Sequence, residues 1–388
     1  MGLFMEAYPK KINILAIDVG TVSISAALVL ASNGLKSEKE GYEVRKVLRY
    51  FFQLIDPASH APKQRSEQIT RVFLGGFNKL FSEIFKIEPK INKILISFAD
   101  PFFSEKNITK KNGRENPKIK ISKGEIDMVA NAMAIEVKKE TANSADLLLA
   151  GQEIISQAVN GYKISSAVGF RGKSLEIQIL FTFLSKFLKD YVEESKEKFF
   201  PLSKIDYYSD IRVLWQILKS TENIFEQEIV VDIGGEMTGL FFADPGGITH
   251  VPAYSFGVRT LERRLAAFLK IDVIEAGAIM KKYASGTLDE ALRIKVIKIF
   301  GVAMEDWWTL FQASLKGQKD IKNIILTGGG ADFQIFAEAI KMNFKKYYDI
   351  EVKTTIIRAE AFRDFFKSLD ALSGGSDVIL TALILYAK

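Results

Sequence analysis

Ile14-Leu-Ala-Ile-Asp-Val-Gly-Thr-Val-Ser23 and Ile229-Val-Val-Asp-Ile-Gly-Gly-Glu-Met-Thr238 lie more than two hundred residues apart and share one pattern. In each stretch, a run of apolar residues ends in Asp-x-Gly, a short polar turn follows, and apolar residues then resume. This pattern predicts a strand, a tight turn and a returning strand. A duplicated hairpin of this kind predicts two similar halves that face each other across a cleft.

A third stretch, Ile324-Ile-Leu-Thr-Gly-Gly-Gly330, is an apolar run that ends in three glycines. A glycine after a strand often makes only a turn, so one such motif alone indicates little. The three motifs in this order favour a nucleotide site, because glycine lets backbone N–H groups approach phosphates closely. Mg²⁺ binds through one or two carboxylates and keeps several waters, so Asp18 and Asp232 are its expected ligands. Thr21 and Ser23 add hydroxyl groups to the first turn.

Length and composition restrict the class of protein. The chain has 388 residues, more than the ~250–300 residues that a single core supports, so two or more domains are expected. It contains no cysteine, which excludes disulfides and thiolate chemistry and fits a reducing cytoplasm. No stretch approaches a membrane span and the start, Met1–Met5, is too short for a signal peptide, so we expect a cytoplasmic protein.

The formal net charge is +6, and much of the excess lies in a basic run between Lys106 and Lys123. This run is expected to be a solvated loop between strands. The alternative is contact with an anionic lipid or an acidic partner. It lacks the interleaved aromatic residues of a nucleic-acid platform, so no nucleic acid is expected as a partner.

Helical and strand patterns alternate along the chain. Residues 66–85, 123–140, 185–198, 209–218, 257–269, 272–283, 288–315, 333–346 and 376–387 are expected as helices. Strands at 152–159 and 174–183, joined through a turn at Asn160-Gly161, would belong to a strand–helix–strand–strand insert. The last helix is apolar almost all round, which indicates burial rather than a membrane surface. Hairpins alternating with helices, twice over, predict an α/β fold of two related domains.

The three glycine motifs in this order resemble the phosphate and adenosine loops of the actin/Hsp70/sugar-kinase ATPase superfamily. Within it, the chain resembles the bacterial FtsA and PilM branch. The stretch from Asn160 to Ile164 and the stretch from Val168 to Ile177 are similar to the end of the SHS2-type insert of FtsA. The stretch from Ile274 to Tyr283 is similar to the helix that presents Glu and Lys to the ribose, and residues 374–386 are similar to the closing helix of the family.

The resemblance implies a ribonuclease H-like, actin/Hsp70-like two-domain ATPase fold with a small inserted α+β subdomain, holding ATP and Mg²⁺. The implied domains are 1–90 and 175–224 for subdomain IA, 91–174 for the SHS2-like insert, 225–360 for domain II, and 361–388 for a helix returning to domain I. The implied site residues are Asp18, Gly20, Thr21, Ser23, Asp232, Gly234, Gly235, Thr238, Glu275, Lys281, Gly328, Gly329 and Gly330, with Asp18 and Asp232 as metal ligands.

Three functions remain open. A PilM-like scaffold would bind the cytoplasmic tail of an inner-membrane pilus protein, and an FtsA-like protein would form filaments and bind a tubulin-like division protein. Both would be recruited to the inner face of the membrane. A small-molecule kinase is the third, but between Thr182 and Asp190 only Asp190 could serve as a general base.

The second turn departs from the usual pattern of the superfamily, because it carries Glu236 and Gly239. A carboxylate at Glu236 would repel phosphates unless it points away or contacts Mg²⁺-bound water. The turn resembles the PilM version more closely, and it predicts nucleotide binding with slow or no hydrolysis.

Overall fold

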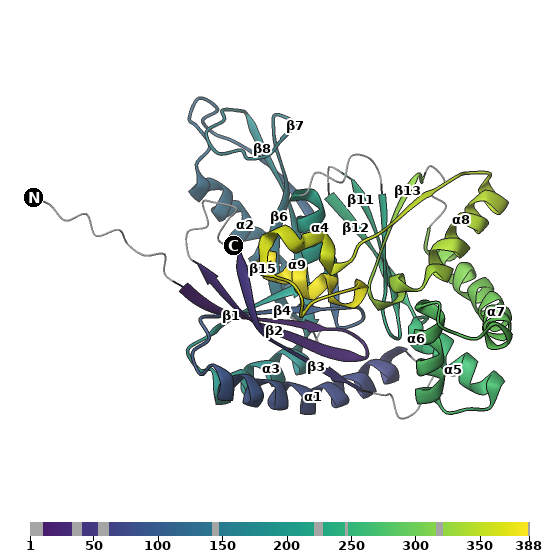
Figure 1. The fold of residues 1–388 in the computed structure, drawn as a ribbon. Coiled ribbons are helices and arrows are strands. Elements are labelled where there is room, and N and C mark those ends of the chain that lie inside the picture. Colours follow the sequence, from purple (N-terminus) through teal and green to yellow (C-terminus); the bar gives the residue numbers. More distant parts are fainter. Residues whose placement is uncertain are drawn as a thin grey trace, which may run out of the picture.

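The computed structural model describes residues 11–32, 41–52, 62–141, 147–220, 228–244, 247–315 and 321–386. The stretch Met1–Met5 lies outside these ranges. Three β-sheets organise the described residues: a six-stranded sheet, a five-stranded sheet and a four-stranded sheet. In Figure 1 the six-stranded sheet lies at the lower left, the five-stranded sheet at the right, and the four-stranded sheet projects at the top.

The first sheet has the strand order β15-β3-β2-β1-β4-β9. Its strands are β1 (Lys11–Val19), β2 (Ser23–Ser32), β3 (Tyr42–Phe51), β4 (Lys93–Phe98), β9 (Lys204–Ser209) and β15 (Phe366–Ser368). The hairpin predicted from the first Asp-x-Gly motif is β1 and β2, which pair antiparallel, and β4 then pairs parallel to β1. The middle of each strand, Ile14 to Ile17 in β1 and Ala26 to Val29 in β2, is apolar and buried, as a strand covered on both faces requires.

The second sheet repeats this plan with the order β12-β11-β10-β13-β14. Its strands are β10 (Glu228–Ile233), β11 (Thr238–Asp244), β12 (Gly247–Tyr254), β13 (Asn323–Thr327) and β14 (Lys353–Ile356). The two aspartates hold equivalent places. Asp18 lies beside Ser25 of the returning strand and Ser97 of the parallel strand. Asp232 lies in the same way beside Gly239 and Thr327. The prediction of two related halves is confirmed.

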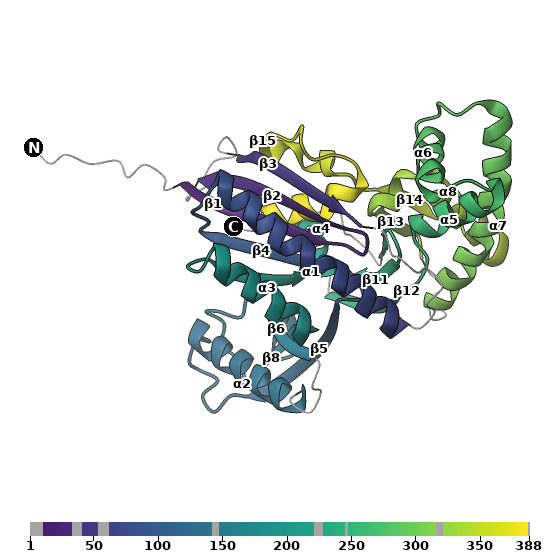
Figure 2. The same ribbon diagram turned by 90° about the horizontal axis from the view of Figure 1, so that it is seen from below.

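Helices cover both faces of the first sheet. They are α1 (Pro62–Ile87), α3 (Lys186–Phe199), α4 (Asp210–Ser220) and α9 (Val378–Tyr386). Figures 1 and 2 show α1 and α3 on one face and α4 with α9 on the other. All eight residues from Val378 to Leu385 are buried, so the helix predicted to be buried at the end of the chain is confirmed as part of the core.

The second sheet is covered by four helices: α5 (Val258–Leu269), α6 (Val273–Ala284), α7 (Glu290–Ser314) and α8 (Gln334–Tyr348). Their starts follow from local chemistry. The carboxylates of Asp272 and Asp289 accept hydrogen bonds from backbone N–H groups in the first turns of α6 and α7, at 2.8 and 2.9 Å. On α7, the ring of Trp307 stacks on Phe311 at 5.1 Å and is fully buried, so it serves the core of this half.

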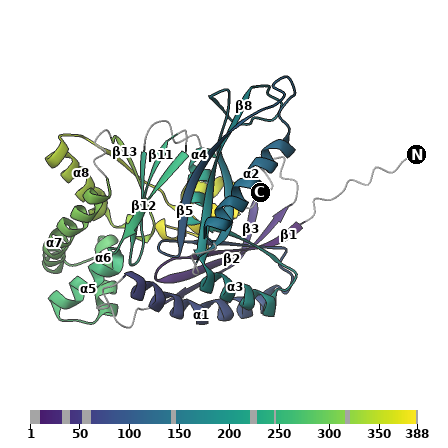
Figure 3. The same ribbon diagram turned by 180° about the vertical axis from the view of Figure 1, so that it is seen from behind.

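The insert forms the third sheet, with the order β5-β8-β6-β7 and one covering helix. Its elements are β5 (Phe103–Gly113), α2 (Lys123–Thr141), β6 (Leu147–Val159), β7 (Tyr162–Ile164) and β8 (Ser174–Ser185). Figure 3 shows α2 against one face of this sheet. The range that we expected for the insert, 91–174, differs from the sheet membership at both ends. Strand β4 belongs to the first sheet, because it pairs with β1 and β9, and β8 belongs to the insert, because it pairs with β5 and β6.

Part of the basic run is a strand and not a loop, which corrects our expectation. Lys106 and Lys110 lie on β5, where each pairs with a carboxylate of α2. The ammonium of Lys106 lies 2.7 Å from Glu140 and that of Lys110 lies 2.5 Å from Glu136. Lys106 and Lys110 are four residues apart and therefore lie on the same face of β5, the face that the covering helix contacts.

A buried polar network fastens the insert to the first half of the molecule. The Nε–H of Arg212, on α4, donates to Glu153 of β6, and its Nη2 donates to the hydroxyl of Tyr386 at 3.2 Å. The guanidinium also lies over the rings of Tyr208 and Tyr386, 5.0 and 5.7 Å from their centroids. Because α4 contributes to both the first half and this junction, the insert is held in a defined place.

Candidate functional site

A cleft of about 740 Å³ separates the two related halves. Both Asp-bearing hairpins contribute to its walls, together with α4, α5, α6 and the start of the C-terminal segment. Ten of the expected site residues line it: Asp18, Gly20, Thr21, Ser23, Asp232, Gly234, Gly235, Lys281, Gly328 and Gly329. The volume lies within the ~300–1,000 Å³ range of small-molecule sites.

The two turns have the same internal hydrogen bond. The N–H of Gly20 donates to the carbonyl of Ser23 at 3.0 Å, and the N–H of Gly234 donates to the carbonyl of Met237 at 2.9 Å. The turns also contact each other, because the backbone N–H of Glu236 donates to Thr21 Oγ1 at 3.0 Å. A Cβ on Gly235 would collide with Val22, so only glycine permits this approach.

The two aspartates at the strand ends lie on the floor of the cleft. The hydroxyl of Ser97 donates to Asp18 Oδ1 at 3.0 Å. Burial raises the pKa of Asp18 to about 7, and the negative charges of Asp232 and Asp377 act in the same direction. Burial also raises the pKa of Asp232 to about 6, with Asp100 adding to the effect. Buried carboxylates that repel one another are the arrangement that a bound cation relieves.

These carboxylates fit Mg²⁺ better than a cation that is held by protein ligands alone. In the described ranges, no three His, Cys, Asp or Glu side chains are close enough to form a metal site by themselves. Mg²⁺ needs only one or two carboxylates, because waters and phosphate oxygens complete its octahedron. Asp18 and Asp232 can supply these two ligands.

Sequence reasoning missed two further carboxylates that line the cleft, Asp100 and Asp210. Asp100 follows β4, and its Oδ2 lies 2.8 Å from His250 Nε2. Asp210 opens α4, and burial together with the charges of Asp232 and Asp100 raises its pKa well above the ordinary value. The similarity of the two halves could have indicated Asp100. Strand β4 pairs with β1 as β13 pairs with β10, and Asp100 follows β4 as Gly328 and Gly329 follow β13.

Glu236 points away from the cleft, which resolves the conflict that its charge posed. Its two carboxylate oxygens each accept a hydrogen bond from Arg263 of α5 at 2.8 Å. The side chain of Glu236 is 3% exposed and that of Arg263 is 23% exposed. The ion pair therefore neutralises the carboxylate on the far side of the phosphate turn.

Thr238 does not line the cleft, so its assignment as a phosphate ligand is corrected. Its hydroxyl donates to the carbonyl of Phe256 at 2.6 Å and accepts from the indole N–H of Trp307 at 3.2 Å. The side chain is fully buried. The strand period explains the error, because Thr238 is the first residue of β11 and its side chain faces the helices rather than the turn.

The three glycines after β13 do not all have the same role. Gly328, with φ of +80°, and Gly329 line the cleft, whereas Gly330 is buried. A Cβ on Gly330 would collide with Ile233, so this glycine serves close packing and not the cleft wall. Our inclusion of Gly330 among the cleft residues is therefore corrected.

On the helices at the other end of the cleft, Lys281 of α6 is a lining residue but Glu275 is not. Glu275 is exposed, in the first turn of α6, where its N–H is capped by Asp272. A different carboxylate, Glu262 of α5, lines the cleft and pairs with Arg259 at 2.5 Å. The acidic residue on this wall therefore comes from α5, and our assignment of Glu275 is corrected.

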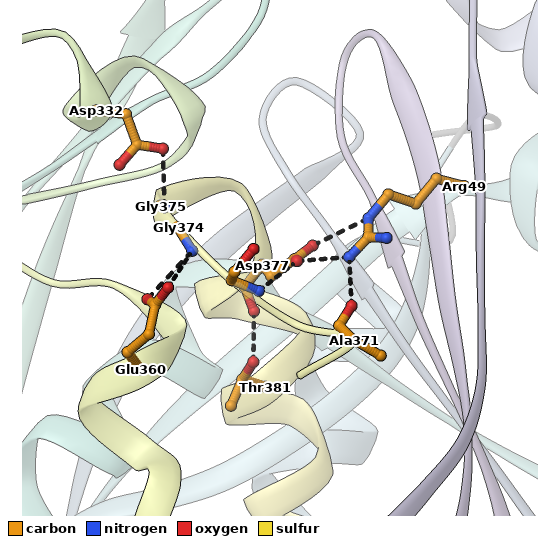
Figure 4. Close-up of polar contacts among 9 residues, drawn as sticks. Arg49, Asp332, Glu360, Ala371, Gly374, Gly375, Asp377 and Thr381 are labelled. Carbon is orange, nitrogen blue, oxygen red and sulfur yellow. Dashed lines mark hydrogen bonds and ion pairs between the residues drawn. The ribbon is translucent and has the colours of Figure 1, made fainter. Parts of the chain in front are cut away.

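The C-terminal segment closes the cleft and joins both halves (Figure 4). Gly375 and Ser376 line the cleft directly beside Gly328. Asp332, in the second half, accepts from the N–H of Gly375 at 3.1 Å. Two residues further along, the buried Asp377 pairs with Arg49 of β3 at 2.5 Å, in the first half. This loop is thus held from both sides of the cleft.

Comparison with known proteins identifies the fold. No protein-family model and no curated protein sequence matches the chain. The structure is similar to a solved PilM-PilN type IV pilus biogenesis complex, with 11% sequence identity, a TM-score of 0.62, and coverage of 96% of this chain and 98% of that chain. The chain has the actin-like ATPase fold.

Weaker likenesses to solved structures with the actin-like fold extend over nearly the whole chain. They include the ethanolamine utilization protein EutJ of Carboxydothermus hydrogenoformans, with 14% identity, a TM-score of 0.47, and coverage of 98% of this chain and 90% of that one. They also include MreB5 of Spiroplasma citri bound to ADP, with 9% identity, a TM-score of 0.46, and coverage of 97% of this chain and 96% of that one.

Proposed function

We propose that this protein binds Mg-ATP between its two halves and acts as a PilM-like scaffold of a type IV pilus assembly machine. The observation that supports it best is the cleft, where equivalent aspartates from two related hairpins face a stretch of bare backbone after β13. This arrangement offers carboxylates for a divalent cation and N–H groups for phosphates on the same wall.

Within the proposed complex, each part of the cleft has a role. Asp18 and Asp232 hold Mg²⁺, which supplies charge neutralisation for the phosphates. The turns at Gly20-Thr21-Val22-Ser23 and Gly234-Gly235 bind the phosphates through backbone and hydroxyl groups. Gly328 and Gly329 lie against the nucleoside, and Lys281 contributes a cation at that end.

Asp210 supports slow hydrolysis or phosphoryl transfer as a second candidate activity. Between Thr182 and Asp190 the sequence offered only Asp190 as a general base for a kinase, yet Asp210 lines the same cleft as the expected metal ligands. A general base must be ionised, and burial raises the pKa of Asp210 well above its ordinary value. Fast turnover is therefore not expected until a bound cation lowers that pKa.

The scaffold role rests on the insert and on the fold shared with the PilM-PilN complex. A groove of about 310 Å³ on the insert, between α2 and β6, is the surface that we assign to a partner, the cytoplasmic tail of an inner-membrane pilus protein. In this proposal the protein is cytoplasmic and the partner recruits it to the inner face of the membrane. In the described ranges, no helix is long and apolar enough to cross a membrane.

Calorimetry tests the nucleotide site. Asp18→Ala and Asp232→Ala should each weaken Mg-ATP binding at least tenfold, whereas Asp306→Ala, a change of the same type on the surface of α7, should leave it unchanged. Equal affinity in all three variants would contradict the site assignment.

Turnover assays test the second activity. ATP turnover on the order of 1 s⁻¹ or faster that is lost in Asp210→Asn would favour an enzyme over a scaffold.

Affinity capture from the native cell tests the partner. The captured protein should be a membrane-anchored pilus protein, and its recovery should fall when Asn131→Trp fills the groove on the insert. Recovery of a tubulin-like division protein instead would favour the FtsA-like alternative.

A further inference from the structure

The far end of the insert is built by two loops that hold each other. We call it the insert tip and define it as residues 114–122 and 160–173. Ile121 donates its N–H to the carbonyl of Phe170 at 2.8 Å and accepts from the N–H of Gly169 at 2.9 Å. Arg171 Nε donates to the carbonyl of Lys118 at 2.8 Å. Figure 1 shows this end, beyond β7 and the start of β8, projecting away from both large sheets.

Tight turns fix the shape of the tip. Asn160 and Gly161 form the predicted turn, with φ of +53° and +86°, and Gly169 has φ of +87°. The carboxamide oxygen of Asn160 accepts from the N–H of Lys173 at 2.7 Å, which ties the turn to the second loop. The tip is therefore a preformed surface rather than a mobile one.

The tip exposes apolar side chains that the core leaves out. Tyr162 is 78% exposed, Ile119 60%, Phe170 50% and Val168 48%. Tyr162 opens the short strand β7 beside the turn, and the other three lie in the connecting loops, where polar residues are the rule. Apolar side chains that project from loop ends in this way are typical of a contact surface.

The same loops are strongly basic. Their exposed cations are Lys118, Lys120, Lys163, Arg171 and Lys173, and their single acidic residue is Glu115. The nearby carboxylate of Glu125 does not offset them, because it pairs with Arg114 at 2.6 Å. Lys106 and Lys110, lower on the insert, are matched by carboxylates of α2. Lys118 and Lys120 of the basic run thus join Lys163, Arg171 and Lys173 in a cluster of positive charge at the tip.

We propose that the insert tip docks on the surface of an anionic lipid bilayer. Cations meet the phosphates of the lipid headgroups, and the projecting tyrosine, phenylalanine and aliphatic side chains enter the boundary between headgroups and acyl chains. Charge complementarity and projecting apolar side chains on one small end fit a bilayer better than a folded acidic protein, which would need a broad matched surface. This contact goes beyond the scaffold function, since it needs neither nucleotide nor protein partner.

Sedimentation of the full-length protein with vesicles tests this site. The protein should bind vesicles of phosphatidylcholine with about one third phosphatidylglycerol, and not pure phosphatidylcholine. Raising NaCl from about 0.1 M to about 1 M shortens the Debye length from ~10 to ~3 Å and should abolish the binding. Each cation removed should weaken partitioning about fivefold, so Lys118→Gln/Lys120→Gln/Lys163→Gln should lose about 100-fold.

Matched controls separate the tip from general charge. The triple variant Lys295→Gln/Lys298→Gln/Lys341→Gln removes three exposed lysines from α7 and α8 and should keep partitioning within twofold. Tyr162→Ser/Phe170→Ser should lose about tenfold, whereas Phe268→Ser/Met342→Ser, with similar exposed fractions, should not. All variants should retain the unfolding temperature, because every side chain changed is exposed.

Three results would overturn the proposal. They are absence of binding to phosphatidylglycerol vesicles, equal losses in tip and control variants, and loss of an acidic protein partner from the tip variants while vesicle binding persists. The nucleotide affinity of the tip variants, measured separately, should be unchanged, so failure here leaves the proposed ATP site unaffected.

Discussion

The ion pair between Glu236 and Arg263 offers a stringent test of how this protein keeps a carboxylate beside a phosphate turn. The change is Arg263→Met, which preserves much of the apolar stem of arginine and removes its two hydrogen bonds of 2.8 Å to Glu236. Breaking a buried pair by removing one partner costs about 3–5 kcal/mol. Because Arg263 is 23% exposed, we expect the lower end, about 3 kcal/mol.

Nucleotide affinity should fall as well. With Arg263 gone, the carboxylate of Glu236 stays behind the phosphate turn but no longer has this cation beside it. At an effective dielectric constant of about 20, a net repulsion of about 1–2 kcal/mol is expected across one turn of backbone, so binding should weaken about tenfold. Glu236→Gln alone should cost about 1 kcal/mol of stability and leave ATP affinity near that of the unaltered protein.

A double-mutant cycle, measured by urea unfolding and by calorimetry, tests whether Glu236 and Arg263 act as a pair in stability and in nucleotide affinity. The double variant Glu236→Gln/Arg263→Met should recover both stability and affinity to the level of Glu236→Gln, with a coupling energy of about 3 kcal/mol. Arg264→Met, which removes an exposed pair with Asp306, is the matched control and should cost less than about 1 kcal/mol. If Arg263→Met is folded and binds Mg-ATP as the unaltered protein does, the reasoning is refuted.

Three further outcomes are expected. Gly328→Ala should abolish nucleotide binding and lower the unfolding temperature, because φ is +80° and the added Cβ would lie 2.6 Å from the carbonyl oxygen of Ile233. Gly301→Ala, on α7 away from the cleft, adds a Cβ that meets nothing within 4 Å and is the control in calorimetry. For Asp18, the pKa rises from 3.8 in the unfolded chain to about 7 in the fold, so the folded state holds an extra proton between these values and stability falls as pH rises through that window. Asp18→Asn should therefore raise the unfolding temperature at pH 8 and not at pH 3, and binding of Mg²⁺ by the unaltered protein should release protons near pH 6. Arg212→Met should cost about 3 kcal/mol, because Glu153 at the insert junction loses its cation and keeps the neutral amide of Gln216 as a donor, and Arg212→Met/Glu153→Gln should recover most of it in denaturant titrations.

The local pattern predicted much of the fold. An apolar run ending in Asp-x-Gly forms a buried strand and a tight turn wherever it stands, so both hairpins and their equivalence followed from residues 14–23 and 229–238. The helix from Val378 to Leu385 was predicted as buried because it is apolar on all sides, and its surroundings confirm it.

The predictions of site residues were wrong where a side chain could point to either face of its strand or helix. Thr238 and Glu275 stand next to correct positions in the chain, but their orientation depends on which face of β11 or α6 meets the cleft. Asp100 and Asp210 carry no motif of their own, and they join the cleft because β4 ends and α4 begins at its floor. The sequence alone offered no means to find Asp210.

By itself, the sequence determined two glycine-rich hairpins, two related halves and a pair of aspartates at the ends of equivalent strands, because strand, turn and burial are set by neighbouring residues. Only the tertiary structure decided which carboxylates share the cleft, that Glu236 is turned aside by Arg263, and that Lys118 and Lys120 of the basic run join other cations at the insert tip. These features depend on contacts between residues far apart in the chain. Electrostatic interactions between such residues depend on their distance in space and not on their separation in the sequence.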